Sequence, residues 1–81
     1  MSSIEKLIRK LAAAKGFVAY AYIERVMHYH GYQKTKVAGS HFHFEKLDAP
    51  PITFPVHNGK VKIWYVRPIL KIIIKEKHEE S

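Results

Sequence analysis

The sequence predicts a small α+β domain: a three-stranded antiparallel sheet with helices on one face and an extra helix at the N-terminus. The chain has 81 residues, room for one domain only, so any active site is expected to be shallow. Apolar residues make up 47% of it, which suits a folded core. Its hydrophobic periodicity is helical at first, alternating in the middle and helical again near the end, and this order predicts the fold class.

The first helix is predicted over residues 4 to 11. Ser2 followed by Glu5 has the spacing of a capping box at its start. The apolar residues fall at i, i+3, i+4 and i+7 and form one stripe: Ile4, Leu7, Ile8 and Leu11. Gly16 supplies a stop, although a helix could continue through it at a cost of about 1 kcal/mol. Residues 1–19 are therefore interpreted as a helical extension, with 16 to 19 as a short connection.

A second helix fits residues 20 to 30, because Gly31 follows as a left-handed cap. Its inward face is expected to hold Ile23, Val26 and Met27. His30 should be half-buried and His28 solvated. The tyrosines in and beside this helix are expected to be packing residues with wet hydroxyls: Tyr20, Tyr22, Tyr29 and Tyr32.

Three strands are predicted next, over residues 32 to 37, 41 to 45 and 52 to 56, with Ala38, Gly39 and Ser40 as a tight turn. The second strand reads His-Phe-His-Phe-Glu, which is the sharpest alternation in the chain. It sends Phe42 and Phe44 to the core and places His41, His43 and Glu45 on an open sheet face, to which parity adds Thr53 and His57. Pro55 lacks an N–H, which predicts that its position in the third strand is unpaired, at an edge of the sheet or near the end of the strand.

A last helix is predicted from residue 64 or 65 to residue 77, with Pro68 in its first turns. Residues 78–81 are read as a frayed tail. Trp64 and Tyr65 at its start could stack on nucleic-acid bases, or they could belong to the core or to a partner contact.

The charge pattern predicts a polyanionic partner, because 14 Lys and Arg oppose 7 Asp and Glu, and residues 31 to 75 alone carry a net +6. The alternative is that dispersed lysines only keep a small protein soluble. The absence of Cys excludes disulfides, cysteine zinc sites and a thiol nucleophile. The apolar stretch from 11 to 22 is too short and broken for a membrane span, and nothing resembles a signal peptide, so a cytoplasmic protein without membrane contact is expected.

His41 is the candidate catalytic residue. An imidazole that titrates near neutrality can take a proton from a ribose 2′-hydroxyl or give one to a leaving 5′-oxygen. Gly39 would let backbone approach a phosphate, and Ser40 could donate a hydrogen bond to it. The alternatives are a plain surface histidine beside a turn, or a metal site formed with His43 and His57.

Basic side chains could line a phosphate track around this site. Lys34 and Lys36 are expected to share a strand face, while a second group lies before and along the last helix: Lys60, Lys62, Arg67 and Lys71. The alternative is a solvated charged face. With Gly39, Ser40 and His43, the lysines at 34, 36, 60 and 62 and Arg67 make up the predicted RNA-binding set, and no cofactor or metal is assigned.

The order of these motifs resembles the HicA family of bacterial and archaeal toxins over about residues 22 to 75. The likeness rests on a helix closed by Gly31 and Tyr32, a polar strand, Gly39-Ser40-His41, the run Ile52-Thr53-Phe54-Pro55-Val56-His57 with Gly59-Lys60, and Tyr65-Val66-Arg67 with Ile69-Leu70. Two features depart from the pattern: Pro68, and the N-terminal helix, which could mediate dimerisation or antitoxin contact.

The resemblance implies a fold similar to double-stranded RNA-binding domains over residues 20–77, and a toxin of a type II toxin–antitoxin system. It implies an mRNA-cleaving endoribonuclease with His41 as the catalytic histidine, neutralised by a cognate HicB antitoxin that covers the active face. We expect this activity to be independent of metal. Two alternatives remain open: an RNA-binding module without catalysis, and a protein-interaction domain that an acidic partner caps.

Overall fold

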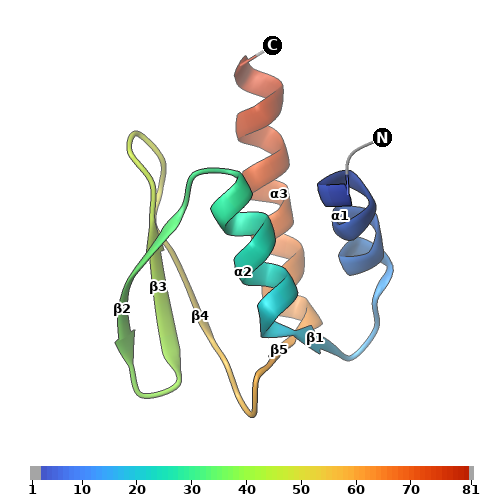
Figure 1. Ribbon diagram of the computed structural model, residues 1–81, viewed down its shortest axis with the longest axis vertical. Helices are drawn as coiled ribbons and strands as arrows, with labels where there is room; N and C mark the ends of the chain where they lie inside the picture. The colour runs from blue at the N-terminus through green and yellow to red at the C-terminus, as the bar shows by residue number, and fades with distance from the viewer. Residues whose placement is uncertain (1–2, 81) are drawn as a thin grey trace.

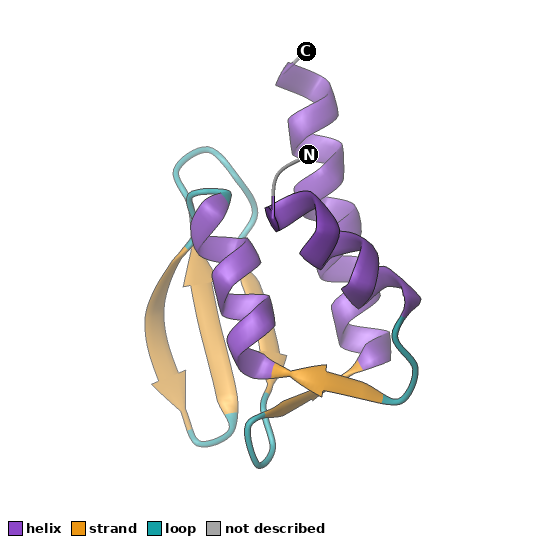
Figure 2. Cartoon of the chain, turned by 45° about the vertical axis from the view of Figure 1, so that its right-hand side comes forward, coloured by secondary structure: helices purple, strands orange, loops and turns teal. Residues whose placement is uncertain are grey.

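The computed structural model describes residues 3–80, with side chains to Ile74, and confirms the α+β fold class. The chain forms, in order, α1 (Ser3–Ala13), β1 (Phe17–Ala19), α2 (Tyr20–Tyr29), β2 (Gln33–Ala38), β3 (His41–Glu45), β4 (Ile52–Pro55), β5 (Lys60–Lys62) and α3 (Ile63–Glu80). Strands β2, β3 and β4 make an antiparallel sheet in chain order. All three helices lie on the same side of this sheet (Figures 1 and 2), an arrangement consistent with a fold like that of double-stranded RNA-binding domains.

The sheet has the two faces that the alternation predicts. Phe44, Ile52 and Phe54 point toward the helices and are buried. The rings of Phe44 and Phe54 are stacked with centroids 5.6 Å apart, so β3 and β4 present one aromatic surface to the helices. Pro55 ends β4, which is an edge strand, as its missing N–H predicts.

A second, two-stranded sheet is the main departure from the predicted organisation. Residues 16 to 19 were expected to be a connection, but β1 pairs with β5 in antiparallel register, Phe17 opposite Lys62 and Ala19 opposite Lys60. Gly16 has φ +79°, so the helix cannot continue through it. Val18 and Val61 are buried opposite each other. A three-residue strand has too little periodicity to be recognised without its partner, which lies 43 residues further along the chain.

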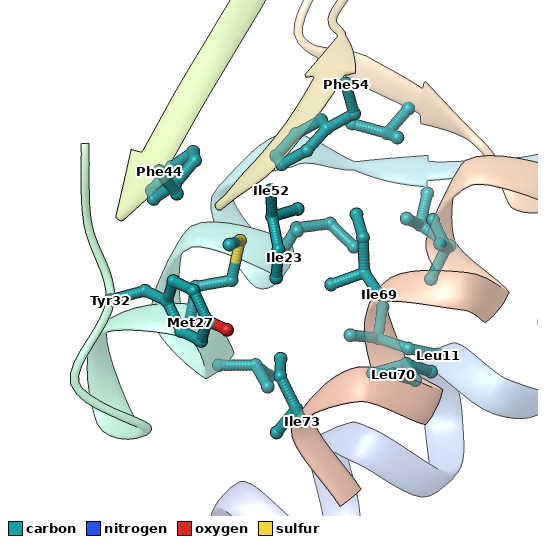
Figure 3. Packing of buried hydrophobic residues seen from close by; sticks show 14 of the residues in the cluster. Leu11, Ile23, Met27, Tyr32, Phe44, Ile52, Phe54, Ile69, Leu70 and Ile73 are labelled. Carbon is teal, nitrogen blue, oxygen red and sulfur yellow. The ribbon is translucent and has the colours of Figure 1, made fainter. Parts of the chain in front are cut away.

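The core is formed by residues from every helix and from both sheets (Figure 3). Helix α2 contributes Ile23, Val26 and Met27, as predicted. Tyr32 is also buried, and its hydroxyl donates a hydrogen bond to the Pro50 carbonyl at 3.3 Å. Helix α3 contributes Val66, Ile69, Leu70 and Ile73 from the helical spacing of its apolar residues.

Helix α1 belongs to this single core. Its apolar stripe of Ile4, Leu7 and Leu11 is buried, and Leu11 is only 1% exposed. The helix lies beside α3 and on the far side of α2 from the sheet (Figure 1). The apolar stripe of α1, which an isolated amphipathic helix would use to bind a partner, is therefore already buried against the rest of this chain.

Two tyrosines of α2 are not packing residues, contrary to the prediction. Tyr22 and Tyr29 are both exposed. They are seven residues apart and so share one helical face, which differs from the face of Ile23, Val26 and Met27. His28 is exposed, whereas His30 is half-buried with its Nδ1 2.9 Å from the Val26 carbonyl oxygen, as predicted for both.

The last helix begins at Ile63, directly after β5, and continues to Glu80, three residues past the predicted end. Pro68 lies in its second turn. Trp64 and Tyr65 are exposed and do not enter the core. The predicted frayed tail over 78–81 includes Ser81, which lies outside the described residues, and stays a prediction.

Candidate nucleic-acid site on the open sheet face

The turn between β2 and β3 positions the candidate catalytic residue. Gly39 is the first of its two turn residues and has φ +61°, where glycine is favoured in type II′ hairpin turns. The Val56 backbone N–H donates to the Ser40 carbonyl with an N···O distance of 2.7 Å. This bond ties the turn to the end of β4, so the backbone entering His41 is held from both neighbouring strands.

His41 is exposed on the sheet face that the helices leave uncovered. It is the first residue of β3 and lies opposite Ala38 on one side and Pro55 on the other. Both of these neighbours are smaller than an imidazole and carry no charge. The ring is therefore accessible to a ligand that approaches this face of the sheet.

His43 lies on the same face, two residues along β3, and is more constrained. Its Nδ1 is 2.8 Å from the Thr53 hydroxyl oxygen on β4, and Lys36 of β2 lies opposite it. The two imidazoles project from Cα atoms about 7 Å apart along the strand. The alternation of side chains along β4 predicts Thr53 on this face. Only the strand register shows that Thr53 lies opposite His43 and is its hydrogen-bond partner.

The expectation that Lys34 and Lys36 share a face was wrong. A register shift lies between them in the β2–β3 ladder, so Lys34 is opposite the buried Phe44 while Lys36 is opposite His43. The extra residue of such a β-bulge reverses the alternation of the strand. Lys34 therefore points to the helix side of the sheet, where its Nζ lies 3.3 Å from Glu24 Oε2 of α2 and 5.3 Å from the centre of the Phe42 ring.

Tyr20, Glu24 and Lys34 form a polar cluster at this edge. The Tyr20 hydroxyl donates to Glu24 Oε2 at 2.6 Å, and Lys34 Nζ lies 3.4 Å from the Tyr20 hydroxyl oxygen. Burial, helped by the hydrogen bond to Glu24, raises the pKa of Tyr20 well above its ordinary value. The hydrogen bond from Tyr20, together with Lys34, lowers the pKa of Glu24. The positive charge of Lys34 is thus partly neutralised within the chain.

The lowered pKa of Glu24 predicts an acid-sensitive contribution to stability. The folded state favours the ionised carboxylate, so this contribution is present above the ordinary pKa of 4.5 and is lost as the pH falls through the lower folded value. The melting temperature of wild type should exceed that of Glu24→Gln at pH 7, and the gap should narrow between pH 4.5 and 3. Glu45→Gln, which changes the net charge equally, is the control. A gap that stays constant down to pH 3 would contradict the prediction.

The remaining basic residues of the predicted set lie on other surfaces. Lys60 and Lys62 are exposed on β5. Tyr65 and Ile69 of α3 line a pocket together with residues of β4. Arg67 is two residues from each of them, so its side chain is rotated by about 200° around the helix axis from both. It projects from the side of α3 away from the sheet. The predicted phosphate track is divided among the open face with Lys36, the β1–β5 ribbon and the outer side of α3.

Among the described side chains, no three of the types His, Cys, Asp and Glu gather closely enough to hold a metal ion. The three-imidazole site from His41, His43 and His57 is therefore not assembled. No helix in residues 3–80 has the length and the apolar character needed to cross a membrane.

Comparison with known proteins identifies the family. The model of the family described as the HicA toxin of bacterial toxin–antitoxin systems matches residues 20–73, two thirds of the chain, from the start of α2 into α3. No curated protein and no solved structure gave a significant match. Membership in this family implies a HicB-type antitoxin as partner. The matched region contains the Gly39-Ser40-His41 turn and the whole open sheet face, and the chain belongs to the HicA toxin family of bacterial toxin–antitoxin systems.

Proposed function

We propose that this HicA-family toxin is an endoribonuclease that cleaves mRNA with His41 and needs neither a metal ion nor another cofactor. The observation that supports this most directly is the exposed imidazole at the start of β3. It stands on an uncovered sheet face, after a turn whose backbone can approach a phosphate. The net charge of +7 favours an RNA substrate.

In the proposed reaction, the neutral His41 ring takes the proton of a ribose 2′-hydroxyl while the 2′-oxygen attacks the adjacent phosphorus. The bond from phosphorus to the 5′-oxygen breaks, and that oxygen takes a proton from the imidazolium, so the ring ends neutral and a cyclic phosphate remains. Proton transfer of this kind contributes roughly 10² to 10⁴ in rate. Slow cleavage of many messages would then account for toxicity.

The neighbouring groups would bind the phosphate. If the Thr53 hydroxyl donates to His43 Nδ1, the Nε2–H of His43 is left to donate outward. Ser40 directly precedes His41, and Lys36 lies opposite His43 in the sheet. The backbone at Gly39 is open, since a side chain there would meet no atom within 4 Å. Gly39, Ser40, His43 and Lys36 are thus the proposed phosphate-binding residues around His41.

The charge environment predicts that Lys36 matters more for RNA than Lys34. Lys36 is free to contact a phosphate on the open face, whereas Lys34 is held by Glu24 on the other side of the sheet. In fluorescence anisotropy with single-stranded RNA and a His41→Ala background, Lys36→Gln should reduce the slope of log affinity against log salt by about 0.7. Lys34→Gln should change it less. Equal changes for the two variants would contradict the assignment of faces.

We also propose that the toxin acts in the cytoplasm and that the HicB-type antitoxin neutralises it by covering the open sheet face. A homodimer through α1 would have to use the polar face of that helix, since its apolar stripe is buried. Sedimentation equilibrium of the free toxin distinguishes a monomer from a dimer.

The test of the proposed function is cleavage of end-labelled single-stranded RNA in EDTA by wild type and His41→Ala. Cleavage by wild type alone supports the metal-independent nuclease. Steeply salt-dependent binding with intact RNA favours the non-catalytic RNA-binding module. Tight binding of an acidic protein without RNA affinity favours the interaction domain.

A further inference from the structure

The outer surface of the β1–β5 ribbon combines exposed aromatic rings with lysines. Alternation along the two strands buries Val18 and Val61 and leaves Phe17, Lys60 and Lys62 outside. Phe17 is 54% exposed, and Trp64, which follows the ribbon in α3, is 59% exposed. The position of these two rings beside lysines, rather than their exposure alone, marks this surface as a candidate contact site.

The lysines lie directly against these rings. Lys60 Nζ is 4.5 Å from the centre of the Phe17 ring, and Lys62 Nζ is 4.9 Å from the centre of the Trp64 ring. Such contacts are weak at exposed positions, so the ammonium groups remain available to another anion. A pocket of about 280 Å³ opens beside them and is lined by Phe17, His57, Asn58, Lys60 and Lys62. None of the described residues that line this pocket carries a carboxylate.

This combination is the one that single-stranded nucleic acid requires. Bases stack on exposed aromatic rings, and ammonium groups bind the phosphates between them. A duplex would keep its bases out of reach of the rings. The carboxylates of an acidic peptide would use the lysines but would not stack on the two aromatic rings, so the observations favour a single strand. The pocket is near the lower limit of ligand pockets, about 300 Å³, and suits one base.

The ribbon is also close to the candidate catalytic residue. Pro55 lies opposite His41 in the sheet. His57 of the pocket is two residues after Pro55, so the Cα atoms of Pro55 and His57 are within about 7 Å of each other. The bond from Val56 to Ser40 holds this segment against the β2–β3 turn. The turn and the loop from β4 to β5 lie at the same end of the molecule (Figure 1). One strand of RNA can therefore reach both surfaces.

We propose that the β1–β5 ribbon is a substrate subsite that binds a nucleotide next to the one cleaved at His41. A base stacks on Phe17 or Trp64, and Lys60 and Lys62 bind the flanking phosphates. This inference rests on the proposed ribonuclease function. Phe17 lies before residue 20, where the family match begins, so the N-terminal segment would extend the substrate-binding surface of the toxin domain.

Fluorescence of Trp64, the only tryptophan, reports on this subsite directly. The probe is a short single-stranded RNA added to the full chain in a His41→Ala background. RNA should quench the emission, and Phe17→Ala should weaken the apparent affinity about tenfold through lost stacking. The double variant Lys60→Gln, Lys62→Gln should reduce the salt slope by about 1.4. Tyr29→Ala and Lys6→Gln, which change an exposed aromatic and an exposed lysine elsewhere, should bind as the background does.

The outcomes separate the subsite from the proposed function. If RNA is bound or cut but leaves Trp64 emission unchanged, or if the ribbon variants bind like the controls, the subsite is overturned and the nuclease stands. If wild type neither binds nor cuts RNA, both proposals fail. If the ribbon variants keep RNA affinity but lose a HicB-type antitoxin, the ribbon is a protein-binding surface and the subsite is overturned. Melting temperatures confirm that each variant folds.

Discussion

His41→Ala is expected to lower RNA cleavage at least about 100-fold and to abolish growth arrest when the toxin is expressed without antitoxin. The reason is that His41 is the exposed imidazole that directly follows the Gly39-Ser40 turn on the open face, and the proposed mechanism assigns the proton transfer to it. Because its side chain is exposed, the substitution should leave the melting temperature unchanged within about 2 to 4 °C.

The measurement is the initial rate of cleavage of end-labelled RNA in EDTA, with an all-2′-deoxy strand of the same sequence as the control substrate. That strand should stay intact, since it lacks the attacking hydroxyl. His28→Ala removes an exposed histidine from α2 and should retain the wild-type rate. A fully toxic His41→Ala protein, or a variant that cleaves at the wild-type rate, would remove His41 from the mechanism.

Leu11→Ala is expected to lower the free energy of unfolding by about 2 to 5 kcal/mol. Leu11 is 1% exposed in α1 and belongs to the same core cluster as α2 and α3, so the truncation leaves a cavity between the helices. The total free energy of unfolding of native domains is only about 5 to 15 kcal/mol, and a domain this small is expected near the lower end of that range. A large fraction of the protein should therefore unfold at mildly raised temperature.

Urea denaturation followed by circular dichroism measures this loss. Lys6→Ala, on the exposed side of the same helix, should change the unfolding free energy by less than about 0.5 kcal/mol. If Leu11→Ala were as stable as this control, α1 would be a loosely attached extension rather than part of the domain. The experiment thus tests whether the segment before the family match is needed for folding.

The faces of α2, β3 and β4 could be predicted from the sequence because each is encoded locally. Helical spacing identified Ile23, Val26 and Met27, and strict alternation put Phe42 and Phe44 on one side of β3 and His41 and His43 on the other. The edge position of Pro55 follows from its missing N–H. The candidate catalytic residue lies in this locally encoded part, so the position of His41 on the open face could be predicted from the sequence alone.

The lysines could not be assigned in the same way. One extra residue in β2 reverses its alternation, and nothing in the run Gln-Lys-Thr-Lys-Val signals that bulge. Arg67 and the lysines of β5 were grouped by their proximity in sequence, whereas the direction of each side chain depends on how α3 and β5 are seated. The local sequence around a long, flexible basic side chain therefore does not predict which surface of the domain that side chain occupies.

By itself the sequence determined the fold class, the buried faces of its longer elements, the basic character of the surface and the position of His41, since each depends on composition or on a period of a few residues. Only the tertiary structure decided that β1 pairs with β5, that α1 completes the core, that Lys34 is held by Glu24 and that Phe17 lies against the lysines of β5. These features arise from contacts between segments distant in the chain. Such contacts are selected by the total burial of the whole domain, which no short window of sequence contains.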